Sequence, residues 1–262
     1  MKPHDISRAK GFTPRPIMLF FLLLFVVASC SGKKDIRPED EFNAEKYLAR
    51  ANELLDNKEY DNARKLLLEV KNRDLTKKYA PVAQMRIADS YLKEGEVELA
   101  TEEYKKFLDL YPDDRSASYA QYQIAMAYFS QIESPDRGFG PAAKALEEFE
   151  KLKRLFPRNP YKELVDLRIE RCRDTIADYE FLVGEFYFKK GSYHAALGRF
   201  RGVLAKFPDY KKEPTVLYHM ALSYKRTGNR EKAEEYFNLL IGKYPHDSLV
   251  REAKKELVSA GK

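Results

Sequence analysis

A repeat with fixed spacing constrains the fold of this chain more than any other feature. One block of the sequence carries small residues, aromatic residues, a glycine and a proline at fixed offsets: Ala88, Tyr91, Gly95, Ala100, Tyr104, Phe107 and Pro112. Blocks that begin at Gly184 and Ala221 repeat these offsets and lie 37 residues apart. Periods of about 20 to 50 residues are typical of solenoids, so we expect repeated units that stack on one another.

The spacing inside each block predicts a pair of helices. Its small and aromatic residues recur at intervals of three and four, which places them on one face of a helix. Ala88 and Ala100 fall on two successive helices, and small side chains there allow the backbones to approach closely. Pro112 ends the second helix, because proline lacks an amide and restricts the residue before it. The block that begins at Ala51 is weaker, since Leu75 stands where the others have proline.

Three segments depart from the regular period. An insertion at residues 133–141 separates the two helices of the third block. Residues 161–190 contain one glycine and no proline, which predicts one long helix. That helix would be either a rigid spacer or a dedicated partner face. Residues 247–258 are predicted to form a terminal capping helix.

The block pattern resembles the tetratricopeptide repeat. This resemblance implies an all-α, right-handed solenoid of about five helix pairs, with the long helix at the junction of the third and fourth repeats. A single solenoid is expected over residues 43–262. Its predicted parts are repeat 1 at 43–79, repeat 2 at 80–116, repeat 3 at 117–160, the long helix with repeat 4 at 161–212, and repeat 5 with the cap at 213–262.

The N-terminus has the features of an exported lipoprotein. A basic stretch precedes the apolar run Ile17–Ala28, which is shorter than the roughly 20 residues that a spanning helix needs. The run ends in Val27-Ala28-Ser29-Cys30, which resembles the lipobox of bacterial lipoproteins. The resemblance implies that residues 1–29 are cleaved, that Cys30 carries N-acyl and S-diacylglycerol lipid, and that residues 30–42 are a tether. The alternative is a plain signal peptide with an incidental cysteine.

Composition argues against a catalyst and against nucleic acid. Beyond residue 29 the chain has 43 Lys and Arg against 40 Asp and Glu, and the two signs alternate along the predicted helices. No histidine stands at metal-ligand spacing from another ligand, and no phosphate-binding glycine loop or nucleophile elbow occurs. We therefore expect no enzymatic activity, no metal and no cofactor apart from the lipid. Cys172 is expected to be a small buried hydrophobe.

The candidate binding residues follow from the tetratricopeptide resemblance, in which the first helix of each pair lines the concave face. The inward positions of blocks two and three are Met85, Asp89, Leu92, Tyr119, Tyr122, Met126 and Phe129, and those of block four are Asp178, Phe181, Glu185 and Phe188. Such aromatic and thioether side chains suit the apolar side chains of a peptide. About half of them are expected to pack against neighbouring helices instead. The carboxylate clamp of related co-chaperones is incomplete, because Leu48 accompanies Asn52 where a lysine is usual.

The lipobox, the aromatic-Pro closures and the insertion in the third block together resemble the BamD family, lipoproteins of the β-barrel assembly machinery. More specific matches are Asp136-Arg137 with Ala142-Ala143, and residues 183–196. The resemblance implies an outer-membrane lipoprotein that faces the periplasm. Its partners would be the POTRA domains of a BamA-type barrel insertase, the other lipoproteins of that complex, and unfolded outer-membrane proteins. It assigns Tyr193 and Arg199 to the insertase contact, and the groove to the C-terminal strand of the unfolded proteins.

Two other classes of envelope protein share part of this pattern. A pilotin-type lipoprotein would also have a lipobox and repeats, but its repeats usually keep a shorter period without the insertion. A Tol-associated coordinator would have similar repeats after an N-terminal coiled coil and without lipid. Residues 31–75 show no sustained heptads.

Overall fold

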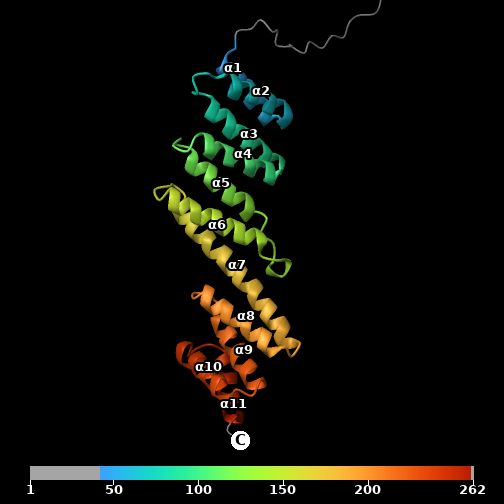
Figure 1. The fold of residues 1–262 in the computed structure, drawn as a ribbon, viewed down its shortest axis with the longest axis vertical. Coiled ribbons are helices and arrows are strands. Elements are labelled where there is room, and N and C mark those ends of the chain that lie inside the picture. Colours follow the sequence, from blue (N-terminus) through green and yellow to red (C-terminus); the bar gives the residue numbers. More distant parts are fainter. Residues whose placement is uncertain (1–41, 261–262) are drawn as a thin grey trace, which may run out of the picture. The chain divides into compact units, whose positions relative to one another are not determined.

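The computed structural model describes residues 42–260, and all the regular structure in that range is helical (Figure 1). No helix there is long and apolar enough to cross a bilayer. The predicted signal peptide and Cys30 lie outside the described residues. The helices are α1 (Ala44–Asp56), α2 (Tyr60–Arg73), α3 (Ala80–Glu94), α4 (Val97–Leu110), α5 (Ala117–Phe129), η1 (Pro135–Arg137), α6 (Gly140–Leu155), α7 (Lys162–Lys189), α8 (Tyr193–Lys206), α9 (Glu213–Arg226), α10 (Arg230–Lys243) and α11 (Leu249–Ala260).

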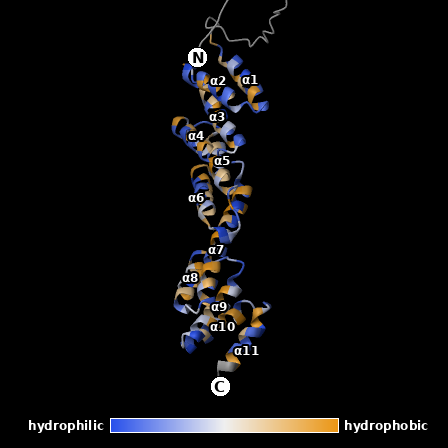
Figure 2. Cartoon of the chain, turned by 90° about the vertical axis from the view of Figure 1, so that its right-hand side faces the viewer, coloured by the Kyte–Doolittle hydropathy of each residue, from blue (hydrophilic) through white to orange (hydrophobic). Residues whose placement is uncertain are grey.

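The helices stack in chain order, and each packs mainly on the helix before it and the helix after it (Figure 1). Antiparallel neighbours form five pairs, from α1 with α2 to α9 with α10, and α11 packs on the last pair. This arrangement confirms the predicted all-α solenoid of the tetratricopeptide type with a C-terminal capping helix. Hydrophobic and hydrophilic residues are interspersed along the whole stack, as expected when each helix buries one face (Figure 2).

The turn inside four of the five pairs has the same backbone geometry. In the second pair, the amide of Glu96 donates to the carbonyl of Tyr91 at 2.9 Å, and Gly95 has φ +90°. This is the left-handed helix ending that favours glycine. Gly191 and Gly228 adopt it too, whereas Lys58 takes the equivalent place in the first pair with φ +62°. The left-handed backbone of this turn therefore explains why the repeat has glycine there in three of these four pairs.

The turns between pairs depend on proline in four places. Tyr111, Phe156, Phe207 and Tyr244 each precede a proline, and their ψ angles lie between 55° and 71°. The proline ring excludes helical ψ values from the preceding residue, so the second helix of each of these pairs ends there.

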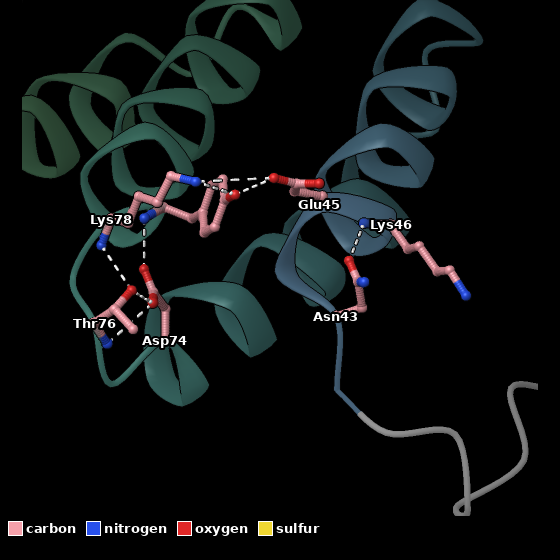
Figure 3. Close-up of polar contacts among 7 residues, drawn as sticks. Asn43, Glu45, Lys46, Asp74, Thr76 and Lys78 are labelled. Atoms are coloured by element: carbon pink, nitrogen blue, oxygen red, sulfur yellow. Dashed lines mark hydrogen bonds and ion pairs between the residues drawn. The ribbon is translucent and has the colours of Figure 1, made fainter.

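The first pair has no closing proline, and Asp74 closes it instead (Figure 3). Its Oδ2 accepts from the backbone amides of Tyr79 at 2.5 Å and Ala80 at 2.9 Å, where α3 begins. Its Oδ1 accepts from the Thr76 hydroxyl at 2.6 Å. Burial opposes ionisation of Asp74, but these hydrogen bonds together lower its pKa below the ordinary value. Asp74 thus holds the start of α3 at the one junction where the repeat lacks its proline.

The core lies along the seams between helices. The alanines at the two small positions of the repeat are almost completely inaccessible, as predicted for Ala88 and Ala100. Where the fourth block has Gly184, the helices approach more closely. A Cβ atom built on Gly184 would lie 2.5 Å from Cε1 of Phe200, which is fully buried. Glycine at this position allows α7 and α8 to pack around the Phe200 ring.

The long helix α7 confirms the prediction for residues 161–190. Its 28 residues extend about 42 Å at the usual rise per residue. The N-terminal part buries Val165, Ile169 and Cys172 in one cluster with α5 and α6, and the C-terminal part buries Ala177 and Phe181 in another with α8 and α9. Cys172 is fully buried, as expected, and burial raises the pKa of its thiol to about 12.

The insertion in the third repeat packs against the middle of α7. It contains the 3-10 helix η1, which contacts α7, and the ring of Phe139 lies 4.9 Å from that of Tyr179. These contacts fix the insertion on the long helix, so it forms part of the solenoid.

Candidate partner-binding surfaces

The residues predicted to line a groove lie on α3 and α5, and they differ in accessibility. Met85 is only 8% exposed and belongs to the core between α3, α4 and α5. The other six, namely Asp89, Leu92, Tyr119, Tyr122, Met126 and Phe129, are half-buried. Packing against neighbouring helices can therefore hold these side chains in position, while part of each remains accessible to a partner.

A polar network joins α3, α4 and α5 at one part of this surface. The hydroxyl of Tyr104 donates to Asp89 Oδ1 at 2.5 Å, and the Tyr119 hydroxyl lies 3.4 Å from the same atom. Gln123 Nε2 donates to the Tyr119 oxygen at 2.6 Å. Burial raises the pKa of the Asp89 carboxyl, and the two tyrosine hydrogen bonds offset this only in part. Asp89 therefore links three helices.

Aromatic side chains form the adjoining part of the surface. The ring of Tyr122 stacks on Tyr161 with a centroid distance of 4.2 Å and an interplanar angle of 18°. Phe129 meets the buried Phe149 edge-on, with centroids 5.9 Å apart. Arg168 of α7 reaches over both α5 rings, with Cζ 5.6 Å from the Tyr122 centroid and 5.7 Å from the Phe129 centroid. We call this set, Tyr122, Met126, Phe129, Tyr161 and Arg168, the α5–α7 aromatic surface.

The sequence reasoning missed Arg168. Its position in the long helix lay outside the repeat template, so no inward offset pointed to it. One indication was present, because the residues one turn away on α7 are Leu164, Val165, Arg171 and Cys172, and none of them is acidic. An arginine without an acid at three or four residues' distance lacks the usual intrahelical partner.

The inward positions of the fourth repeat are engaged in internal contacts. Asp178 Oδ1 accepts from the Tyr210 hydroxyl at 2.5 Å and from Lys212 Nζ at 2.7 Å. Phe181 is buried, and the rings of Phe181 and Phe188 lie 5.6 Å and 5.3 Å from His219. Glu185 faces the same histidine at 3.6 Å. The half-buried aromatic surface is therefore concentrated in the third repeat.

A second candidate surface lies where α8 meets the C-terminal part of α7. Arg199 is exposed and pairs with Glu180 through Nη1 and Oε2 at 2.9 Å. Both residues line a surface hollow of about 410 Å³ together with Tyr187, Ala195, Gly198, Gly202 and Lys206. Tyr193 is half-buried at the start of α8, with its ring edge-on to Phe188 at 5.5 Å. Of the two predicted contact residues, Tyr193 and Arg199, only Arg199 lines the hollow.

An exposed aromatic residue on α7 was also missed. Phe186 is 56% exposed, and its ring meets that of Tyr187 edge-on. Large apolar side chains in such positions are enriched at protein interfaces. The sequence alone did not distinguish Phe186 from its half-buried neighbours, because the aromatic run 186–188 covers more than one face of the helix.

Comparison with known proteins identifies the family. Residues 40–240 match the profile of the family described as YfiO, outer membrane lipoprotein. The matched range contains both candidate surfaces and most of the helical stack. The chain belongs to the YfiO family. The family description associates its members with the outer membrane.

Several curated relatives of this YfiO-family chain carry the name outer membrane protein assembly factor BamD. The protein from Caulobacter vibrioides is 25% identical over 254 residues, which cover 95% of this chain and 83% of the relative. The protein from Rickettsia prowazekii is 27% identical, covering 84% of this chain and 88% of the relative. The protein from Neisseria meningitidis serogroup A is 23% identical, covering 91% of this chain and 95% of the relative.

Solved structures similar to the YfiO-family chain include other helical-repeat proteins. The TPR2AB domain of yeast Sti1, in complex with pHSP90, superposes with a TM-score of 0.45 at 17% identity, covering 83% of this chain and 86% of that one. A thermophilic TPR protein of Thermus thermophilus gives a TM-score of 0.34 at 20% identity, covering 83% of this chain and 98% of that one.

Proposed function

We propose that this chain is a non-enzymatic scaffold that assists the assembly of outer-membrane proteins. The observation that carries the proposal is the family match over residues 40–240, together with relatives named as assembly factors that align with most of the chain. Its fold supports the proposal, because a stack of helix pairs offers extended surfaces for partners. Within the described residues, no three His, Cys, Asp or Glu side chains gather to hold a metal.

The α5–α7 aromatic surface is the proposed receiving site for an unfolded outer-membrane protein. A strand destined for a β-barrel alternates apolar and polar side chains, so an extended segment can present a row of apolar groups on one side. Half-buried Tyr122, Met126 and Phe129 offer matching contacts that are already held in place by packing. Little side-chain entropy would be lost on binding, which favours affinity.

Attachment to the membrane is proposed to occur through lipid on Cys30. A single acyl chain gives only marginal membrane binding, whereas two or more chains anchor a protein stably. The tether at residues 30–42 would place the helical array beside the membrane on its periplasmic side. That position suits a receiver of proteins on their way into the outer membrane.

The surface around Arg199 is the proposed contact with a barrel insertase. An exposed guanidinium beside a hollow of about 410 Å³ can donate hydrogen bonds to a carboxylate or carbonyl group of a partner. The Arg199–Glu180 pair is exposed on the arginine side, and such pairs contribute only about 0 to 1 kcal/mol to stability. The exposed Arg199 guanidinium can therefore contact a partner while it stays near the half-buried Glu180.

The proposed function is tested by capturing the lipidated protein from its own envelope in mild detergent and identifying bound proteins by mass spectrometry. Recovery of a barrel protein with POTRA domains, and of other lipoproteins with it, is the expected result. Recovery of a secretin without such a barrel would overturn the proposal in favour of a pilotin. Recovery of Tol proteins alone would favour an envelope coordinator.

The insertase contact is tested with Arg199→Glu in the same capture experiment. The variant should lose most of the barrel protein while keeping its helicity. Arg201→Glu makes the same charge change on the exposed surface of the same helix, outside the hollow, and should capture normally. Equal capture by both variants would show that Arg199 has no part in the contact.

The receiving site is tested with Met126→Ser and Phe129→Ser, measured by the affinity for a peptide from the C-terminal strand of an outer-membrane protein. Each should weaken binding by roughly 4- to 13-fold, because a half-buried side chain can gain on binding only about half of the 1.5 to 3 kcal/mol of complete burial. Leu110→Ser removes a comparable apolar group from the exposed side of α4 and serves as the control. Unchanged affinity in the two α5 variants, with intact circular dichroism, would exclude this surface.

A further inference from the structure

The turn between α2 and α3 carries a leucine that neither the repeat nor the core explains. Leu75 stands where the later repeats have proline, and its side chain is 93% exposed. The second most exposed large apolar side chain among the described residues, Val258, reaches 71%. Single exposed apolar residues are common on protein surfaces. At 93% exposure, however, Leu75 has almost no internal contact that would account for a leucine at this place.

Hydrogen bonds hold the backbone on both sides of Leu75. Its own amide donates to the carbonyl of Arg73 at 3.0 Å, and the amide of Lys77 donates to the carbonyl of Asp74 at 3.2 Å. The buried Asp74 also accepts from the amide and the hydroxyl of Thr76, at 3.2 Å and 2.6 Å. The outward position of Leu75 is therefore a fixed feature of the fold.

Basic side chains surround Leu75. Arg73, Lys77 and Lys78 are exposed, whereas the acid of the turn, Asp74, is buried. Residues 71–78 contain four basic side chains against this one acidic side chain. An exposed apolar group among lysines suits a surface that offers both apolar and anionic groups. A bilayer with anionic lipids is such a surface.

The same turn lies beside the point at which the chain enters α1 (Figure 3). The Tyr79 hydroxyl donates to Glu45 in the first turn of α1, and Lys78 Nζ lies 4.0 Å from that carboxylate. Cζ of Arg73 lies 4.6 Å from the ring centroid of Phe42, the first described residue. Whatever holds the start of α1 therefore also holds the α2–α3 turn.

We propose that the α2–α3 turn docks on the membrane that holds the lipid anchor, with Leu75 in the interfacial layer and Lys77 and Lys78 against anionic phospholipid. This inference rests on the proposed lipid on Cys30. Residues 31–42 can extend at most about 40 Å, so the anchor would keep the turn close to the bilayer. A contact that is weak by itself is then sufficient, because docking of an anchored protein is intramolecular. Docking would determine which end of the first helix pair faces the membrane.

The test uses the full-length lipidated protein in vesicles of phosphatidylcholine and phosphatidylglycerol, with an environment-sensitive fluorophore on one introduced cysteine. Cys172 is buried and Cys30 would be acylated, so the label reacts at the introduced position. In Leu75→Cys the emission should shift to shorter wavelength, and spin-labelled lipids should quench it. Asp56→Cys carries the label at the other end of α1, and Val258→Cys carries it on α11; both should report water.

Two lysines provide a matched pair for the role of charge. Lys77 and Lys58 are both exposed, have left-handed φ values of 56° and 62°, and follow opposite ends of the helices of the first pair. In the protein labelled at residue 75, Lys77→Gln should lower the ratio of docked to undocked protein about fivefold, since one basic side chain near an anionic surface contributes roughly that factor. Lys58→Gln should leave the ratio unchanged.

Flotation of the protein with the vesicles reports on the anchor independently. If the protein floats and the label at residue 75 remains in water, the turn does not dock and the lipid anchor stands. Equal shifts at residues 75 and 56 would also overturn the docking, since nearness to the anchor would then explain both. Equal effects of Lys77→Gln and Lys58→Gln would overturn the contact with anionic lipid. Protein that does not float would refute the anchor and the docking with it.

Discussion

Because α7 and α8 approach closely at Gly184, we predict that alanine at this position destabilises the protein, although alanine has the higher helix propensity. Replacing a glycine inside a helix with alanine normally stabilises a protein by about 0.5 to 1 kcal/mol. At Gly184 the added methyl group would lie 2.5 Å from one atom of the Phe200 ring and 2.8 Å from another. Ordinary contact begins near 3.4 Å, so the ring or the helix must move by almost 1 Å. Phe200 is fully buried, so a shift of its ring must displace neighbouring side chains.

The expected magnitude follows from these two opposing effects. Overpacking a close-packed core by one methyl group costs about 1 to 3 kcal/mol. After the gain in propensity is subtracted, Gly184→Ala should lower the free energy of unfolding by about 1 kcal/mol. Gly198→Ala is the matched control, because Gly198 lies inside α8 and no atom lies within 4 Å of its added Cβ. That control should raise stability by about 0.5 to 1 kcal/mol.

Urea unfolding followed by far-ultraviolet circular dichroism would measure both variants. The two should differ by about 1 to 3 kcal/mol, which is the overpacking cost alone. Combining Gly184→Ala with Phe200→Leu should recover part of the loss, and a double-mutant cycle would show coupling between the two positions. If Gly184→Ala is as stable as Gly198→Ala, the ring moves at no cost and the packing argument is refuted.

Three further predictions concern single side chains. Lys58→Gly should raise the free energy of unfolding by about 0.5 to 1 kcal/mol in urea, because lysine is disfavoured at the left-handed φ of +62°; unchanged stability would show that Lys58 adopts this φ without measurable cost. Asp74→Ala should lower stability by about 1 kcal/mol at pH 7 through loss of the α3 cap. Folding lowers the pKa of Asp74, so its contribution to the free energy of unfolding is complete above the unfolded pKa of about 4 and disappears as the pH falls further. A stability difference between wild type and Asp74→Ala that persists in acid would contradict this. Cys172, whose thiol is buried with a pKa of about 12, should react with a thiol reagent only in denaturant, and rapid labelling of the folded chain would show that α6 and α7 open locally.

Local rules predicted most of the fold. The glycine and proline positions specify turns by their own backbone preferences, so they could be recognised without tertiary information. The near-absence of such residues between 161 and 190 was enough to predict α7. The cap at Asp74 was not foreseen, because it is formed by one side chain and amides five and six residues away, for which one sequence offers no distinct pattern.

The binding surface was less predictable, for a physical reason. Helical spacing indicates which side of a helix a residue occupies. The packing of the neighbouring helix pair determines how much of that residue's side chain remains exposed. Met85 and Met126 have the same kind of side chain at inward positions, and only Met85 is buried. Arg168 could not be placed in the groove because its helix runs past the limits of the repeat. The proposal for Cys30 concerns residues that the structure does not describe.

The long helix has a consequence for how the array unfolds. In a stack of independent repeats, either end can open while the remainder stays folded. Here one unbroken helix contributes to the cluster with α6 and to the cluster with α8, and Thr175 between these parts is itself 2% exposed. Neither half of the stack can then open fully without removing support from the other. Backbone amides near Thr175 should exchange with solvent only during global unfolding, whereas those of α1 and α11 should exchange through cheaper local opening. A mechanical force applied by a partner bound at the α5–α7 aromatic surface or at the Arg199 hollow would therefore be transmitted through α7 to both halves of the array.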